Sequence, residues 1–520
     1  MVTQTWIATD RPDHPFADPK KARAVIAELP AQNALKALEE IAFWLDSVTR
    51  TEGIEPAQRF EAFDLLDQAA KNHHVSVARE YLRGSRLQKF QENRLWSVSF
   101  DFWKALAAAY IQLVEQFQAD VPGTAALRKD MPAIVARALR AITLQLKWTL
   151  LRYGAVEDRI WGDLNRLYLF AESHGFAAKL VSVYPGLHGE SSVQRELLKT
   201  LMLSMSSTDS LVPLELEVAE RLVAYFGDRF ILTGEPFEAC HFSFDLSMRK
   251  PPARVIKGVD HSSVVRYFGA GKGLEGLLAL KDEIAEKGAV PADIPLGGSY
   301  DVAVVTPVLE HLAQYWADKP PARHSERRFM ASRMTVVHGF ADVLRCLQPQ
   351  GGTGAATTPD LVDTDSTESW IVENVSDGGY GAIIPQVRGD WVRVGSLVGF
   401  RTETRKQWSA GVVRRITRDE YQQRRVGIQT LGKVAIAITL TPTGTISTIN
   451  AVRDGDVAVL LSAAPDENQE VTVVMRVGTF TPQQELEMRV RGKGYLVQPV
   501  TLLEGGEDFD WVRLRLLRRL

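Results

Sequence analysis

The chain has 520 residues, of which 45% are hydrophobic and 24% are charged, and its formal net charge at pH 7 is −3. This composition excludes fibrous and wholly disordered proteins, and the length predicts two to four domains at roughly 100–200 residues each. The near-neutral charge excludes a global attraction for nucleic acid polymers, so any anion site must be local. Two cysteines, Cys240 and Cys346, exclude a disulfide framework and favour a reducing compartment.

The sequence also gives an expectation about location. The first residues, MVTQTWIATD, show no basic start followed by an apolar stretch, so no secretory signal is predicted. Apolar runs such as Ala105–Tyr110 are much shorter than the roughly 18 residues that suggest a membrane span. We therefore expect a cytoplasmic protein without membrane insertion.

Helical periodicity dominates residues 1–318, which we interpret as an all-α helical bundle. In Ala34–Val48 the apolar residues recur at the spacing of one helix face. Similar patterns predict helices at Phe60–Ala70, Phe102–Phe117, Val135–Tyr153, Trp161–His174, Gln194–Met205, Pro213–Phe226, Ser263–Lys287 and Asp301–Ala317. Residues 230–255 break this pattern, and the alternation in HFSFDLSM predicts an extended segment there.

After about residue 320 the hydrophobic period becomes two, which predicts strands. Residues 319–433 predict a small β-barrel, and residues 434–520 a second β-rich domain. The predicted strands are Met334–Val337, Trp370–Val375, Gly381–Ile384, Val392–Arg401, Ala410–Ile416 and Val426–Leu431, then Val434–Leu440, Val457–Leu461, Val471–Val477, Glu485–Val490, Tyr495–Leu502 and Trp511–Leu517. Residues 349–369 contain no aromatic residue and predict a flexible loop. The fold class is therefore α+β multidomain.

Two basic segments and one polar corner stand out in the first predicted barrel. Lys319–Arg333 contains five basic residues and one acid, and Arg401–Arg425 contains eight basic residues and three acids. Asn374-Val-Ser-Asp-Gly-Gly379 ends one predicted strand and turns into the next. Together these features predict a local surface that attracts anions.

These residues resemble the PilZ family of bacterial cyclic di-GMP receptors. That family has an arginine segment, commonly R-x-x-x-R, just before the first barrel strand, and then [D/N]-x-S-x-x-G at a strand end. Asn374, Ser376 and Gly379 fit the second motif without a gap. Arg328 and Arg333 have four intervening residues where three are usual, whereas Arg323 and Arg327 have the usual spacing but lie further from the strand. The resemblance covers roughly residues 320–435 and does not include the helical part.

The resemblance implies a ligand site formed by six residues: Arg327, Arg328, Arg333, Asn374, Ser376 and Gly379. A guanidinium group can bind a phosphate or the guanine O6/N7 edge with two hydrogen bonds, and it can stack on a purine. The asparagine and serine side chains can bond guanine edges or phosphate oxygens. A glycine at the corner would permit positive φ and a close approach of the backbone to the ligand. The arginine segment, flexible by composition, would fold over the strand end.

Two functions remain open from the sequence. The first is a cytoplasmic receptor that binds cyclic di-GMP and relays this to a protein partner through its helical domain. The alternative is a PilZ-like scaffold that binds proteins but not the nucleotide, because Asn-x-Ser-x-Gly-Gly is also ordinary turn chemistry and arginine clusters are often solvated surfaces.

Catalytic and metal sites are not predicted. The glycine-rich stretch Gly269–Gly273 lacks the first glycine and the Ser or Thr of a phosphate-binding P-loop. Cys240 and His241 have no nearby partners with zinc-ligand spacing. We therefore predict no enzyme activity, no metal and no cofactor, with cyclic di-GMP as the ligand.

Overall fold

The computed structural model describes residues 13–83, 88–184, 189–256, 262–319, 321, 326–348, 367–385, 391–419, 421, 423–443 and 456–520. The chain forms two compact units. The helical unit comprises residues 1–208 and 213–321, and the β unit comprises residues 209–212 and 322–520. The predicted α+β architecture, with helices first, then a β-barrel and then a second β-rich domain, is confirmed, and the second domain also forms a closed barrel.

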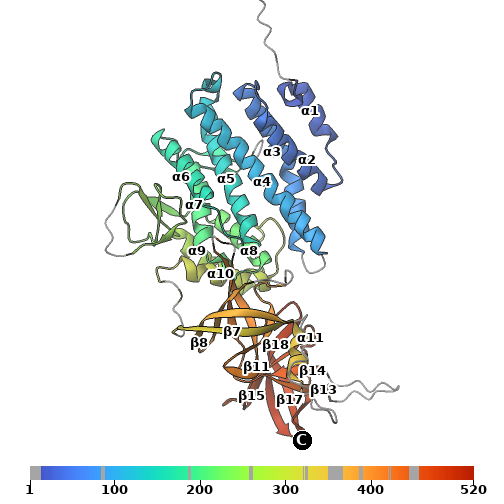
Figure 1. Cartoon of the computed structure of the whole chain (residues 1–520). Coiled ribbons are helices and arrows are strands. Elements are labelled where there is room, and N and C mark those ends of the chain that lie inside the picture. The colour runs from blue at the N-terminus through green and yellow to red at the C-terminus, as the bar shows by residue number, and fades with distance from the viewer. Residues whose placement is uncertain are drawn as a thin grey trace, which may run out of the picture. The chain divides into compact units, whose positions relative to one another are not determined.

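The helical unit is built largely from helices that pack side by side (Figure 1). Its α-helices are α1 (Pro19–Glu28), α2 (Ala34–Arg50), α3 (Pro56–Leu82), α4 (Lys89–Gln118), α5 (Met131–Leu150), α6 (Asp158–Ser173), α7 (Val193–Met205), α8 (Pro213–Tyr225), α9 (Lys272–Lys287) and α10 (Val302–Trp316). Short 3₁₀ helices occur at η1 (Pro15–Ala17), η2 (Thr124–Lys129) and η3 (Thr208–Ser210). Within the described residues, no helix combines the length and the apolar character needed to cross a bilayer.

Helix α2 shows how the sequence produces this packing. Asn33 caps its first turn by accepting a hydrogen bond from the Lys36 N–H at 3.0 Å. The buried residues of α2 recur at helical spacing, so one face enters the core and the other remains in solvent; they are Ala37, Leu38, Ile41, Leu45 and Val48.

A small antiparallel sheet interrupts the helices of this unit. Its order is β3–β6–β4–β5, formed by β3 (Ile231–Thr233), β4 (Phe242–Asp245), β5 (Ala253–Arg254) and β6 (Val265–Gly269). A two-stranded pair, β1 (Val181–Ser182) and β2 (Glu190–Ser191), lies earlier in the chain. The segment 230–255, which the sequence predicts as extended, contains the strands β3, β4 and β5. The predicted helix Ser263–Lys287 is wrong in its first part. The β-branched and aromatic residues of β6 pair with β4, and the helix begins only after Gly271, whose φ is 51°.

The first barrel is closed, with the strand order β10–β11–β12–β9–β8–β7. Its strands are β7 (Arg328–His338), β8 (Glu368–Ser376), β9 (Gly379–Ile384), β10 (Leu397–Thr402), β11 (Arg405–Arg418) and β12 (Arg424–Thr430). The predicted flexible loop at 349–369 falls, as far as residue 366, outside the described residues. Trp370 is fully buried and fills the barrel, as its strand alternation requires.

The second barrel is also closed, with the order β13–β14–β15–β18–β17–β16. Its strands are β13 (Ile436–Pro442), β14 (Asp456–Leu460), β15 (Glu470–Arg476), β16 (Leu486–Val490), β17 (Lys493–Gly505) and β18 (Phe509–Arg519). Taken in chain order, its six strands have the same neighbours as those of the first barrel. The second β-domain is therefore a barrel with the same connectivity as the first.

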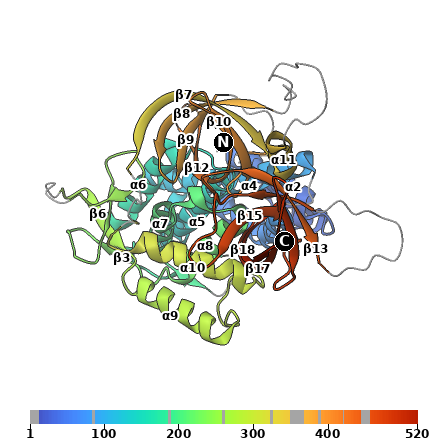
Figure 2. The ribbon, with the colours of Figure 1, turned by 90° about the horizontal axis from the view of Figure 1, so that it is seen from below.

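The two barrels share a hydrophobic core, and helix α11 (Phe340–Leu347) packs against strands of both (Figure 2). Phe340 and Val343 of this helix cluster with Val412 of the first barrel and with Val459 and Phe509 of the second. This shared core explains why both barrels belong to one compact unit.

Helix α5 carries cations into the core of the helical unit. Lys147 is nearly fully buried and lies 2.5 Å from a carboxylate oxygen of Glu217 and 2.8 Å from one of Glu220. Burial opposes the ionisation of Glu220, but Lys147, Arg221 and Lys199 together outweigh it and lower the pKa of Glu220. These charges remain buried only because they compensate one another.

Lys147→Met should therefore destabilise the helical unit strongly, by roughly 3–5 kcal/mol, because it removes the buried cation that lies nearest to both carboxylates and leaves them only partly compensated by Arg221. Urea unfolding followed by circular dichroism at 222 nm measures the change. Lys281→Met is the matched control, since Lys281 and Glu310 form an exposed pair at 3.7 Å, and its expected effect is within about 0.5 kcal/mol. Equal unfolding midpoints for the two variants would contradict the stabilising role of Lys147.

Candidate functional site

The Asn374–Gly379 corner is the tight turn between β8 and β9. Ser376 pairs with Gly379, and Asn374 pairs with Gly381, across the antiparallel strands. The Ser376 hydroxyl lies 3.4 Å from the Gly379 carbonyl oxygen, which is a long hydrogen bond. The Asn374 side chain lies over Gly381, where an added Cβ would come within 2.7 Å of its amide atoms. The corner thus holds an amide and a hydroxyl at one end of the barrel.

Gly379 has a structural reason that the sequence did not predict. Its φ is not in the positive range, so the expected need for a left-handed backbone is wrong. Instead, strand β12 approaches so closely that a Cβ at residue 379 would lie 1.9 Å from the Ile428 carbonyl oxygen. Glycine therefore permits a close approach between two strands.

The arginine segment belongs to the first strand. The sequence predicted that this strand begins near Met334, with the arginines before it, whereas β7 begins at Arg328. Arg328 pairs with Val375, which stands between Asn374 and Ser376, and Arg333 pairs with Ile371. The expectation of a segment that folds over the strand end is thus corrected for residues 328–333, because their backbone is held by pairing with β8. Arg323 lies outside the described residues.

The irregular spacing of the arginines has a structural counterpart. Between Phe329 and Ser332 the register of β7 against β8 shifts by one residue, which is a β-bulge. Arg328 and Arg333 are five positions apart in β7, yet their partners Val375 and Ile371 are four apart in β8. The bulge thus accommodates one additional residue between the two arginines.

The two faces of the sheet separate the arginines. Tyr380, which pairs with Val375, contacts the buried Phe400 ring, so Val375 and its partner Arg328 belong to the inner face at the barrel end. Phe329 pairs with Asn374 and shares the outer face with it. Arg327 directly precedes β7, next to the Arg328–Val375 pair. Arg333 pairs with Ile371, which is three residues from Asn374 along β8. The Arg333 position is therefore about 10 Å from Asn374 in the strand direction.

The arginine side chains of the two basic segments have different partners. Arg414 bonds Gln429 at 2.6 Å and binds both carboxylate oxygens of Glu504, and Arg425 lies 3.7 Å from Glu373. Arg401 lies over the Trp408 ring. By contrast, the guanidinium groups of Arg327, Arg328 and Arg333 form no ion pair within the described part of the chain. None of these three therefore has to leave a carboxylate of the described residues before it can receive an external anion.

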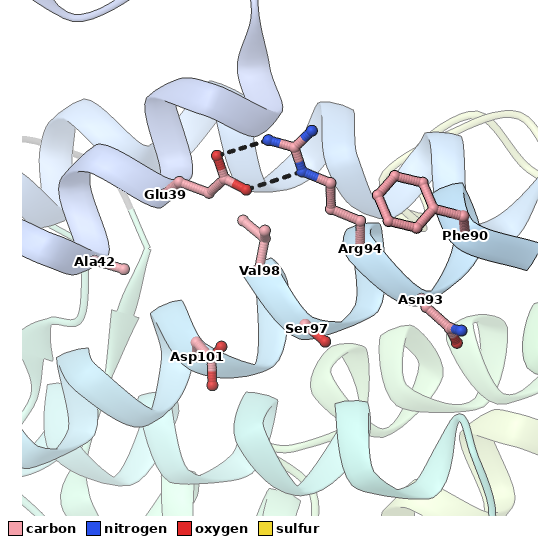
Figure 3. A pocket seen from close by; sticks show the side chains of 8 residues that line it. All are labelled: Glu39, Ala42, Phe90, Asn93, Arg94, Ser97, Val98 and Asp101. Carbon is pink, nitrogen blue, oxygen red and sulfur yellow. Dashed lines mark hydrogen bonds and ion pairs between the residues drawn. The ribbon is translucent and has the colours of Figure 1, made fainter.

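A separate pocket of about 490 Å³ lies on the helical unit, along α2 and α4 (Figure 3). Its single arginine, Arg94, donates two hydrogen bonds to Glu39, at 3.1 and 3.0 Å. Burial raises the pKa of the other acid, Asp101. A pocket whose cation is already paired and which carries a further carboxylate disfavours an anionic ligand. The corner on the first barrel is therefore the better candidate site for a nucleotide.

The chain matches two family models. Residues 20–236 match the model described as the N-terminal domain of the cyclic-di-GMP receptor FimW, and residues 353–436 match the model described as its middle PilZ domain. The second match includes Asn374, Ser376 and Gly379 but begins after β7. The first extends the relationship to the helical part, which the sequence motifs did not cover. The search of curated proteins finds no match.

Gly379→Ala should destabilise the first barrel because the added methyl group meets the β12 backbone, which cannot move away without breaking strand pairing. Gly378→Ala is the matched control, since an added Cβ at residue 378 meets nothing within 4 Å. Thermal unfolding should show a lower midpoint for the first variant alone. A Gly379→Ala protein as stable as Gly378→Ala would contradict the steric role of Gly379.

Proposed function

The chain belongs to the family of PilZ-domain cyclic-di-GMP receptors that both models describe, and we propose that it binds cyclic di-GMP at the end of the first barrel that carries the corner. The proposed site combines the corner residues Asn374, Ser376 and Gly379 with the arginines of the β7 segment, Arg327, Arg328 and Arg333. The observation that carries this proposal is the register of β7, which pairs Phe329 with Asn374 and so brings the adjoining arginines, Arg327 and Arg328, to the corner.

The arginines supply the attraction for the two phosphates. Each guanidinium group is permanently charged and can bind a phosphate through two parallel hydrogen bonds. Since Arg327, Arg328 and Arg333 are exposed and form no ion pair in the described part of the chain, no existing ion pair has to break when a phosphate arrives. Arg327 stands nearest the corner, while Arg333 can reach the part of the ligand that lies further along β8.

The corner supplies recognition of the base edges and closes one side of the site. The Asn374 amide offers both a donor and an acceptor, and the Ser376 hydroxyl offers the same. The Ser376 bond to the Gly379 carbonyl is long at 3.4 Å, so exchanging it for a ligand contact costs little. Gly379 contributes through the close packing of β9 against β12.

We further propose that nucleotide binding alters the protein interactions of the helical unit. The match of residues 20–236 to a domain of a cyclic-di-GMP receptor supports this, because it assigns the helical part to the same kind of protein. Within the β unit, a physical connection leads away from the site: Gln429 pairs with Gly379, and Arg414 links Gln429 to Glu504 on β17. A ligand that shifts the corner would therefore also displace Glu504 in the second barrel through this chain of contacts.

Calorimetric titration of the full chain with cyclic di-GMP should show binding, and Asn374→Ala and Arg327→Ala should each weaken it. A lost hydrogen bond is worth about 1–3 kcal/mol, which corresponds to roughly 5- to 150-fold in Kd. Arg518→Ala, which removes an exposed arginine from β18 of the other barrel, should leave the affinity unchanged. Absence of binding by the unaltered protein would leave the non-binding scaffold as the function.

Saturation with cyclic di-GMP should change amide hydrogen exchange in peptides of the helical unit as well as in the first barrel. The physical reason is that a ligand shifts a conformational equilibrium only if it binds one arrangement more tightly. The measurement compares the full chain with and without ligand, and Asn374→Ala under the same conditions is the control. Protection confined to the first barrel would show binding without coupling.

A further inference from the structure

We infer that Phe329 is a stacking platform for one guanine ring of the ligand, and this inference rests on the proposed function. Phe329 lies in the β7 segment between the arginines, yet it belongs to no recognised part of the motif. Its side chain is 85% exposed, more than any other large hydrophobic side chain in the described part of the chain. Such a position requires an explanation, because a phenyl ring gains about 1.5–3 kcal/mol when it is buried.

The strand register places this ring beside the corner. Phe329 pairs with Asn374, so the two side chains stand next to each other on the outer face, with Cα atoms about 4.5–5.5 Å apart. The β-bulge begins directly after Phe329, and bulges commonly redirect a side chain at a functional site. The ring therefore has a defined neighbour although it has no packing role in the core.

Two glycines follow Asn374 in the row of paired positions next to the ring. Asn374 pairs with Gly381 of β9, and Gly381 pairs with Gly427 of β12. Neither glycine raises a side chain above the sheet, and the Asn374 amide lies across Gly381. These four residues, Phe329, Asn374, Gly381 and Gly427, form an outer shelf of successive paired positions, which carries an aromatic ring, an amide and two glycines.

The chemistry of this shelf suits a planar purine. A base stacks favourably on an aromatic ring whatever its sequence, and arginines on either side can contact the attached phosphate. The Asn374 amide, next to the ring, can bond the edge of the same base. An isolated phosphate would gain nothing from the phenyl ring, so the combination favours a nucleotide over a simple anion.

Titration of the full-length protein with cyclic di-GMP tests the inference through a series at one position. Phe329→Ala and Phe329→Leu should each raise Kd by about tenfold to a hundredfold, since leucine keeps the apolar volume but loses the ring. Phe329→Tyr should retain the affinity of the unaltered chain. Tyr421→Ala is the matched control, because Tyr421 is an 83% exposed aromatic residue in the connection between β11 and β12, at the other end of the barrel from the corner.

Each outcome decides between distinct possibilities. Thermal midpoints of all four variants should match that of the unaltered protein, because exposed rings add little to stability, and a large drop for Phe329→Ala would indicate a structural role instead. If the unaltered chain binds and Phe329→Ala binds equally well, the stacking role is wrong while the proposed function stands. If the unaltered chain does not bind, both are overturned.

Discussion

The pairing of β7 with β8 is the constraint on which the proposed site depends. Backbone hydrogen bonds between these strands fix the Arg328, Phe329 and Asn374 positions relative to one another. A one-residue slip would move every side chain of β7 to the opposite face and separate the aromatic ring from the amide. The bulge between Phe329 and Ser332 shows that the register is held even though the strand contains an additional residue.

Much of the architecture could be predicted from the sequence because it follows from local periodicity. The amphipathic pattern of Ala34–Val48 leads directly to α2, and the alternation after residue 320 leads to strands that close into two barrels. The polar corner was also recognisable, since asparagine, serine and two glycines at a strand end specify a tight turn. These features depend on neighbours in sequence, which is the information a single sequence contains.

The remaining features depend on partners that are distant in sequence. The sequence of Arg328–Arg333 indicates a basic segment before a strand. Only its pairing with β8 shows that this segment is part of β7. Likewise Val265–Gly269 continues into a helical pattern, but pairing with β4 makes it a strand. The reason for glycine at residue 379 is the Ile428 carbonyl, almost fifty residues away. Tertiary contacts override local propensity in all three cases.

The two barrels share their strand connectivity, and their differences show why the first is the better nucleotide site. In the first barrel the third strand begins with Gly379, directly after a two-residue turn. The arginines beside this corner have no ion pair in the described part of the chain. In the second barrel the third strand begins with Glu470, which is nearly buried and holds Arg513 and Arg515 at 3.5 and 2.9 Å. A carboxylate at this place would repel a phosphate and already occupies the nearby guanidinium groups. The same fold therefore carries a glycine at the start of the third strand in one barrel and an internally paired carboxylate at that place in the other, and this difference favours the first barrel for the proposed site.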